Sequence, residues 1–172
     1  MIETSLNNLA DFCIKNSQMI ATAESCTGGM VAKLITDRAG SSQWFERGFV
    51  TYSNLSKEQM LGVDEQLINA CGAVSEAVAE AMAKGVLEHS QAHYALAITG
   101  IAGPGGGTKT KPVGTVCFAW AYYDLISKDR ATKEIKYITN TRHFSGDRLA
   151  VRTQSAHYSL HKLDEIIKHI SV

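Results

Sequence analysis

The sequence predicts an α/β protein: a three-layer α/β/α single domain over residues 1–172, with a mixed sheet that ends in an antiparallel hairpin. Two observations support this class. Apolar segments of strand length alternate with segments of helical periodicity along most of the chain, a pattern typical of parallel strands joined by helical crossovers. The last two strand-like segments follow one another directly and precede a long amphipathic segment, which predicts a hairpin and a final helix.

The amino-terminal part of the chain predicts one short strand between two helices. Apolar residues at helical spacing indicate a helix over residues 6–13, with Ser5 as the expected N-cap. A buried strand is expected over residues 19–23. A polar, glycine-containing turn over residues 24–29 follows it and leads into a second helix over residues 30–35.

The next segment predicts a strand that runs directly into a helix. The strand is expected over residues 45–52 and the helix over residues 54–61. We expect the helix to begin either at Asn54 or at a capping box formed by Ser56 and Gln59.

A longer helix is expected over residues 75–88, followed by a buried strand over residues 94–99. Small residues on the apolar stripe of this helix, Gly85 among them, predict that the sheet approaches it closely. The segment 100–114 is different in kind, because it holds six of the fourteen glycines and both prolines. It is expected to be a loop.

The last part of the chain predicts a hairpin and a terminal helix. Strands are expected over residues 113–123 and 134–144, joined by a charged turn around residues 127–130. Residues 145–147 are expected to open the last helix. Its predicted buried stripe consists of Leu149, Ala156, Leu160, Leu163, Ile167 and Ile170.

Composition excludes several classes of protein. The chain has 172 residues, and its 17 Lys and Arg balance 17 Asp and Glu, so it lacks the positive excess of nucleic-acid or anionic-membrane binders. No apolar run is long enough for a membrane span, and the amino terminus lacks the pattern of a signal peptide. The four cysteines have no C-x-x-C spacing. We therefore expect a cytoplasmic protein without disulfides, structural zinc, nucleic-acid partner or membrane partner.

Two segments carry residues suited to catalysis. Ser25 lies between a strand and a helix, where backbone N–H groups can meet a phosphate or a developing oxyanion. Helix capping by Ser25 or Thr27 is the simpler role of such residues. Tyr52 is expected at a strand end, and Lys57 in the first turn of the next helix. A helix amino terminus and burial both lower the pKa of a lysine, which then can act as a base for a serine. A solvated surface lysine is the simpler alternative.

Three further features give weaker signals. The glycine-rich segment 100–107 follows a strand, but it matches neither a Walker A loop nor a dinucleotide fingerprint. His157 and His161 are four residues apart without the Glu of a zinc-protease motif, so we expect no metal there. Arg148 and Arg152 are spaced to clamp a phosphate or to pair with surface acids.

Five motifs occur together and in order along the chain. They are T-A-E-S-C-T-G-G (22–29), T-Y-S-N-x-x-K (51–57), A-I-T-G-I-A-G-P-G-G-G (97–107), K-P-V-G-T-V (111–116) and F-S-G-D-R-x-x-V-R (144–152). On these motifs the chain closely resembles the CinA C-terminal domain family, whose stand-alone members are nicotinamide-nucleotide amidases. The resemblance covers nearly the whole chain.

The resemblance implies an activity and a set of site residues. The family hydrolyses the carboxamide of nicotinamide mononucleotide to nicotinate mononucleotide and ammonia, needs no cofactor or metal, and is commonly a homodimer or higher homo-oligomer. Its serine, lysine and tyrosine fall on Ser25, Lys57 and Tyr52. The substrate-binding residues expected here are Glu24, Cys26, Thr27, Gly28, Gly29, Asn54, Thr99, Gly100, Gly103, Arg148 and Arg152.

Within this set, the backbone N–H groups near Cys26 and Thr27 are expected to form the oxyanion hole. The glycine-rich loop, with Arg148 or Arg152, is expected to hold the ribose phosphate. Two alternatives stay open on the sequence. One is a Cys26 thiolate nucleophile, against which the lack of a nearby histidine counts. The other is a catalytically silent nucleotide-binding or partner-binding module, from which ammonia release from nicotinamide mononucleotide would distinguish the enzyme.

Overall fold

The structure is a computed structural model that describes residues 2–124 and 134–171. Over these residues the chain forms five strands, six α-helices and one short 3-10 helix. In chain order they are α1 (Ile2–Lys15), β1 (Ile20–Glu24), α2 (Met30–Thr36), η1 (Ser41–Gln43), β2 (Phe45–Val50), α3 (Asn54–Leu61), α4 (Glu65–Cys71), α5 (Glu76–Glu88), β3 (Tyr94–Gly100), β4 (Thr115–Tyr123), β5 (Ile135–His143) and α6 (Arg148–Ile170).

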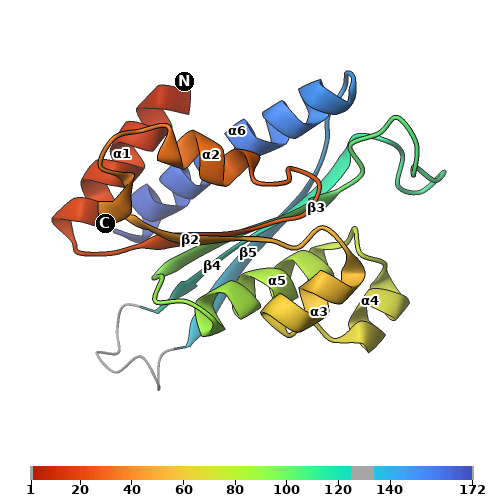
Figure 1. The fold of residues 1–172 in the computed structure, drawn as a ribbon, viewed down its shortest axis with the longest axis horizontal. Coiled ribbons are helices and arrows are strands. Elements are labelled where there is room, and N and C mark those ends of the chain that lie inside the picture. The colour runs from red at the N-terminus through yellow and green to blue at the C-terminus, as the bar shows by residue number, and fades with distance from the viewer. Residues whose placement is uncertain (1, 125–133, 172) are drawn as a thin grey trace.

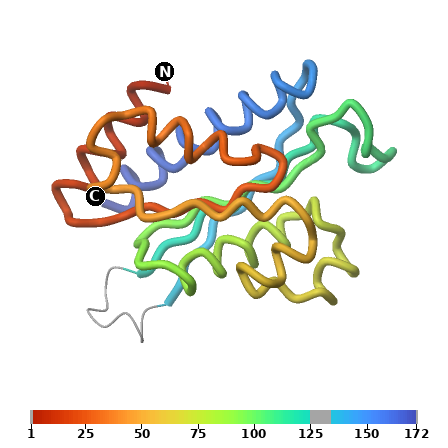
Figure 2. The backbone as a smooth tube through the Cα atoms, viewed as in Figure 1, coloured from red at the N-terminus to blue at the C-terminus, as the bar shows by residue number. Residues whose placement is uncertain are grey.

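The elements form three layers, which confirms the predicted fold class. Helices α1, α2 and α6 cover one face of the sheet, and α3, α4 and α5 cover the other (Figure 1). The strand order is β2-β1-β3-β4-β5. Strand β1 pairs in parallel with both β2 and β3, whereas β3–β4 and β4–β5 are antiparallel. The first and last helices lie side by side, and both ends of the chain lie on the same side of the fold (Figure 2).

The topology gathers three chain segments at one edge of the sheet. Because β1, β2 and β3 run in parallel, their carboxyl ends lie at that edge. The chain leaves β1 for β2 on one side and later returns to β3 on the other. Ligands of open α/β sheets bind where the connections diverge in this way. The turn that contains Ser25 follows β1 directly, so it lies at this switch point.

The two faces of the sheet carry side chains of different size. On β4, the bulky Phe118 and Trp120 belong to the core under α1, α2 and α6, whereas Ala119 and Ala121 belong to the core against α5. This follows from the alternation of side chains along a strand. Alanines on the second face let α5 pack close to the sheet.

Several local expectations are wrong. Ser5 lies inside α1, buried at 2% exposure, and does not cap it. Helix α3 is capped by Ser53 through a capping box with Ser56. Leu149 is 61% exposed and is not part of the buried stripe of α6, which Val151 begins at 0% exposure.

Two differences concern the segment between β2 and β3. Helix α4 has no counterpart in our sequence-based elements; Asp64 caps it through the N–H of Gln66. Gly85 faces the last residue of α3 and not the sheet, because a Cβ at Gly85 would collide with the carbonyl oxygen of Leu61. The predicted charged turn around residues 127–130 lies outside the described residues.

No helix in the described part of the chain is long and apolar enough to cross a membrane.

Candidate active site

The turn that contains Ser25 is fixed between β1 and α2 by its backbone. The N–H of Ser25 donates to the carbonyl of Ile98 on β3 at 3.0 Å, and the N–H of Gly28 donates to the carbonyl of Ser25 at 3.1 Å. Gly28 and Gly29 have φ values of 59° and 94°, a region that side chains with a Cβ disfavour. The turn therefore needs its two glycines, and Ser25 itself is 8% exposed.

Lys57 reaches this turn from the first turns of α3. Its Nζ lies 3.2 Å from the Oγ of Ser25, and it donates to the carbonyl oxygens of Thr51 at 3.0 Å and of Ser53 at 3.5 Å. The residue is 1% exposed, and no acidic side chain among the described residues forms an ion pair with it. Burial lowers the pKa of Lys57 from its ordinary value of 10.5 because desolvation disfavours the charged form.

Tyr52 lies at the surface, between β2 and α3 in the chain. It is 59% exposed, and its hydroxyl accepts a hydrogen bond from Arg148 at 2.7 Å. Within residues 2–124 and 134–171, no hydrogen bond joins this hydroxyl to Ser25 or Lys57. The structure thus brings Ser25 and Lys57 into contact and places Tyr52 with Arg148.

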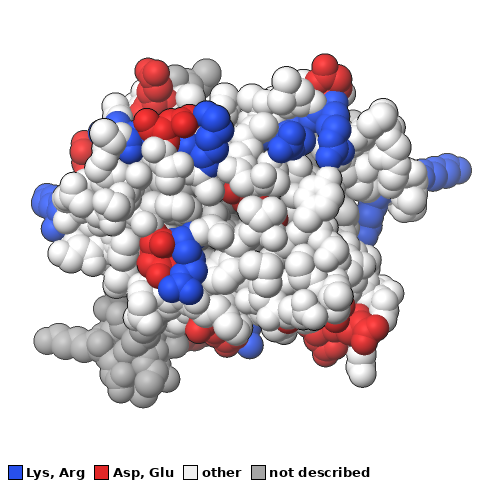
Figure 3. All heavy atoms as spheres, viewed as in Figure 1, with Lys and Arg blue, Asp and Glu red and all other residues white. Residues whose placement is uncertain are grey.

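The two arginines of α6 have different partners. The Nη1 of Arg148 donates to the carbonyl oxygen of Gly103 in the glycine-rich loop at 2.8 Å. Arg152 donates through Nε to the carbonyl of Cys26 at 3.0 Å and through Nη2 to that of Thr27 at 2.8 Å. Figure 3 shows basic side chains gathered over the amino-terminal part of α6, to which both arginines belong. The site therefore has a local excess of positive charge, although the net charge of the chain is zero.

Glu24 is the last residue of β1 and is buried at 1% exposure. Its carboxylate accepts three backbone hydrogen bonds from the start of α2: from Gly29 at 3.1 Å, Val31 at 3.0 Å and Ala32 at 2.9 Å. These bonds use N–H groups that the first turn of a helix leaves without helical partners. Glu24 thus fixes α2 relative to β1.

Cys26 is unsuited to act as the nucleophile in this arrangement. Its side chain packs in the core under α1, α2 and α6 and is 6% exposed. Burial raises the pKa of the thiol to about 12, so the reactive thiolate is scarce at neutral pH. The main-chain N–H groups of Cys26 and Thr27 are available to a bound ligand, because no other described residue accepts a hydrogen bond from them.

The other predicted binding residues lie around the same edge of the sheet. Thr99, buried near the end of β3, donates its hydroxyl to the carbonyl of Ala73 at 2.8 Å. Gly100 ends β3 against Val116, which a Cβ would meet at 2.8 Å. Asn54 is exposed at the start of α3. Thr99 is therefore engaged with the α4–α5 connection, while Asn54 is open to solvent.

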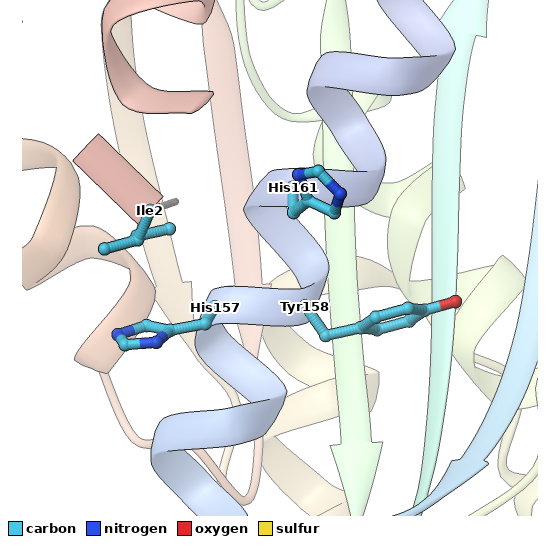
Figure 4. Close-up of a pocket in the computed structure, with 4 residues that line it drawn as sticks. All are labelled: Ile2, His157, Tyr158 and His161. Carbon is cyan, nitrogen blue, oxygen red and sulfur yellow. The ribbon is translucent and has the colours of Figure 1, made fainter. Parts of the chain in front are cut away.

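The histidine pair of α6 forms no hydrogen bond with the turn of Ser25 among the described residues. His157 and His161 line a hollow with Ile2 and Tyr158 where α1 meets α6, and Figure 4 shows His157 directed toward Ile2. His161 lies 3.1 Å from the hydroxyl of Ser5 through Nδ1. Across the described residues, no group of three or more His, Cys, Asp or Glu side chains could hold a metal ion.

Sequence reasoning did not predict the groups that hold Lys57. Thr51 and Ser53 act through their carbonyl oxygens, and any residue type supplies such an oxygen. The one available signal was position, since both residues fall between a strand and the helix that carries the lysine. An uncharged amine held by two carbonyls and facing a hydroxyl can accept the hydroxyl proton.

Comparisons with known proteins agree with the fold. The model of the CinA C-terminal domain matches residues 2–167. The chain is 56% identical over 144 residues to the nicotinamide-nucleotide amidohydrolase PncC of Escherichia coli K12, which covers 84% of this chain and 81% of that protein. It is 45% identical over 154 residues to the protein of the same name from Pseudomonas putida, which covers 90% and 89%.

A solved structure resembles the whole chain. The competence damage-inducible protein A from Klebsiella pneumoniae superposes with a TM-score of 0.85 at 33% identity, covering 98% of both chains. The family match spans nearly all of the chain, and the relatives match over most of their own lengths. The chain therefore belongs to the CinA C-terminal domain family.

Proposed function

We propose that this protein is an amidohydrolase that converts nicotinamide mononucleotide and water to nicotinate mononucleotide and ammonia. The observation that carries the proposal is the contact of 3.2 Å between Ser25 Oγ and Lys57 Nζ in a buried turn at the switch point of the sheet. The substrate is taken from the names of relatives that are 45% and 56% identical to this chain. A serine with a buried basic partner is suited to attack an amide.

In the first step, Lys57 acts as the general base. An uncharged amine has two N–H groups and one lone pair. The carbonyls of Thr51 and Ser53 can take the two N–H groups, which leaves the lone pair for the hydroxyl of Ser25. Lys57 takes that proton as Ser25 Oγ bonds to the carboxamide carbon, and the carbonyl oxygen becomes an oxyanion. The N–H groups of Cys26 and Thr27 are the donors that we assign to it.

In the next steps, the proton moves on to the leaving group. The Lys57 ammonium gives its proton to the amide nitrogen, the C–N bond breaks, and ammonia leaves the nicotinoyl ester of Ser25. Water then attacks the ester carbon, and Lys57 takes a proton from the water. The ester C–O bond breaks, Ser25 regains its proton from Lys57, and nicotinate mononucleotide is released. Atoms and charges balance without a metal ion or a cofactor.

Tyr52 and Arg148 form the surface side of the site. The hydroxyl of Tyr52 accepts from Arg148, so its own O–H remains free to donate to the substrate. We assign it the role of orienting the carboxamide or relaying a proton to it. Arg148, which also holds the carbonyl of Gly103, is the arginine that we assign to the phosphate. Thr99 and Gly100 at the end of β3 and Asn54 at the start of α3 are proposed to contact the nucleotide.

The decisive experiment is an assay of the purified protein with nicotinamide mononucleotide in a buffer that contains a strong chelator. We expect ammonia release together with a product that is heavier by about 1 Da, because an amide NH₂ is replaced by OH. The Ser25→Ala variant is the control. Failure of the correctly folded wild-type protein to release ammonia would contradict the proposal and favour the silent binding module. The cytoplasmic location and the homo-oligomeric state stay predictions.

A further inference from the structure

Two charged side chains hold the turn of Ser25 and the start of α2. Glu24 takes N–H groups at the start of α2, and Arg152 takes the carbonyl oxygens of Cys26 and Thr27. Together they make five hydrogen bonds to main-chain groups of the seven residues from Cys26 to Ala32. Glu24 is buried at 1% exposure and Arg152 is half-buried. Hydrogen bonds that involve an ionised group are stronger than neutral ones, so this turn is held more firmly than its backbone bonds alone would allow.

The bonds of Arg152 also fix the direction of an amide. In a planar trans peptide, the carbonyl of one residue and the N–H of the next point in opposite directions. Arg152 Nε holds the carbonyl of Cys26 toward α6, so the N–H of Thr27 must point away from Arg152. The neighbouring peptide is fixed in the same way, because the carbonyl of Ser25 accepts from Gly28, which directs the N–H of Cys26.

Glu24 holds the start of α2, which follows the same turn. Its carboxylate accepts from the N–H groups of Gly29, Val31 and Ala32, so these groups cannot bind another anion. The main-chain carbonyl of Glu24 accepts a hydrogen bond from the N–H of Thr51 at 2.9 Å. The main-chain carbonyl of Thr51 in turn accepts from Lys57 Nζ. Glu24 thus connects the segment of the nucleophile with the segment of the base.

We propose that Glu24 and Arg152 are positioning residues that keep the N–H groups of Cys26 and Thr27 oriented toward the oxyanion before the substrate binds. This inference rests on the proposed function and deepens it. It also assigns different roles to the two arginines of α6. Arg152 serves the turn through Nε and Nη2, and the phosphate is left to Arg148.

The first test compares Arg152→Ala and Arg152→Lys on nicotinamide mononucleotide and on its riboside, which lacks the phosphate. Loss of one oxyanion donor lowers kcat by about 100- to 1,000-fold; we expect a loosened donor to lower it by about 10- to 100-fold on both substrates, with KM changed less than about threefold. Arg47→Ala is the matched control, because Arg47 also donates to a backbone carbonyl, that of His89, away from the site. A loss confined to the nucleotide would overturn the proposal and make Arg152 a phosphate ligand.

A second readout does not depend on the amide substrate. A fluorophosphonate probe forms a bond between its phosphorus and Ser25 Oγ and releases fluoride, and the developing negative charge on its oxygen needs the same donors. We expect Arg152→Ala and Glu24→Gln to slow this labelling by at least about tenfold, and we expect methylguanidinium to restore part of the rate in Arg152→Ala. Glu76→Gln is the control for the acid, since Glu76 accepts from Thr139 and Thr141 at the other side of the sheet.

The labelling separates two kinds of failure. If the wild type is labelled but does not deamidate nicotinamide mononucleotide, the proposed substrate is wrong and the role of the two positioning residues is still measured. If folded Arg152→Lys and Glu24→Gln are labelled at the wild-type rate, the positioning role is overturned, whatever the substrate. Thermal unfolding of each variant establishes that it is folded.

Discussion

Lys57 Nζ lies 3.2 Å from Ser25 Oγ, although 32 positions separate the two residues in the sequence. The contact arises because β1 and β2 are parallel neighbours, with Glu24 in register with Val50. The segments that follow these strands therefore leave the sheet at the same edge. The turn after β1 supplies the serine, and the helix after β2 supplies the lysine. Both side chains are buried, so their contact is shielded from water. This favours the uncharged form of the lysine, because water stabilises the protonated form.

The first prediction concerns the choice of nucleophile. Ser25→Ala is expected to lower kcat on nicotinamide mononucleotide by at least about 1,000-fold, because it removes the attacking oxygen. Cys26→Ala is expected to retain substantial activity, since the pKa of about 12 keeps the Cys26 thiol protonated. Steady-state ammonia release from both variants gives the answer. The reverse pattern would transfer the role to Cys26.

The second prediction concerns the phosphate. Arg148→Ala is expected to raise KM for the nucleotide and to affect the riboside less, because the riboside loses only the support that Arg148 gives to Tyr52. Loss of a hydrogen bond to a charged group costs about 1.5–3 kcal/mol, or about 10- to 100-fold in kcat/KM. The measurement is the ratio of kcat/KM for the two substrates, in the wild type and in the variant. A wild-type ratio of one would remove phosphate recognition from the site.

The third prediction concerns the packing of α5 against α3. Alanine is favoured over glycine within a helix by about 1 kcal/mol, yet we expect Gly85→Ala to destabilise the protein. The added methyl group would collide with the carbonyl of Leu61, and overpacking of this kind costs about 1–3 kcal/mol. Gly105→Ala is the control, because nothing lies within 4 Å of a Cβ there. Denaturant unfolding measures the free energy of unfolding of both variants. A Gly85→Ala variant more stable than the wild type would contradict the prediction and show that α3 moves aside at little cost.

The sequence was sufficient for the order of the five strands and of every described α-helix except α4, because these elements have a clear period. Strands β3 and β4 are buried apolar segments, and α6 has a long apolar stripe. Errors arose where a residue's role depends on distant partners. Ser5 resembles an N-cap, but it is buried in α1 against His161 of α6. Gly85 was expected to let the sheet pack closely against α5, but it is the end of α3 that packs closely there.

The candidate site was predictable only in part for the same reason. Local position singled out Ser25 and Lys57, and the family motifs joined them, but spacing alone gives no distance between residues on different strands. The different partners of Arg148 and Arg152 were not predictable either. The two residues are one helical turn apart, so both face the same side of α6. Which carbonyls each one meets depends on how α6 packs over the turn and the glycine-rich loop.

The most direct test of the account is the pH dependence of kcat for the wild type and for Lys57→Arg on nicotinamide mononucleotide. Because burial lowers the pKa of Lys57, the uncharged amine should form below the ordinary value, and wild-type kcat should rise with pH and level off below pH 10.5. Arginine keeps its proton, so Lys57→Arg should lose at least about 100-fold in kcat and show no such rise. A Lys57→Arg variant that keeps most of the wild-type kcat would contradict the assignment of Lys57 as the base.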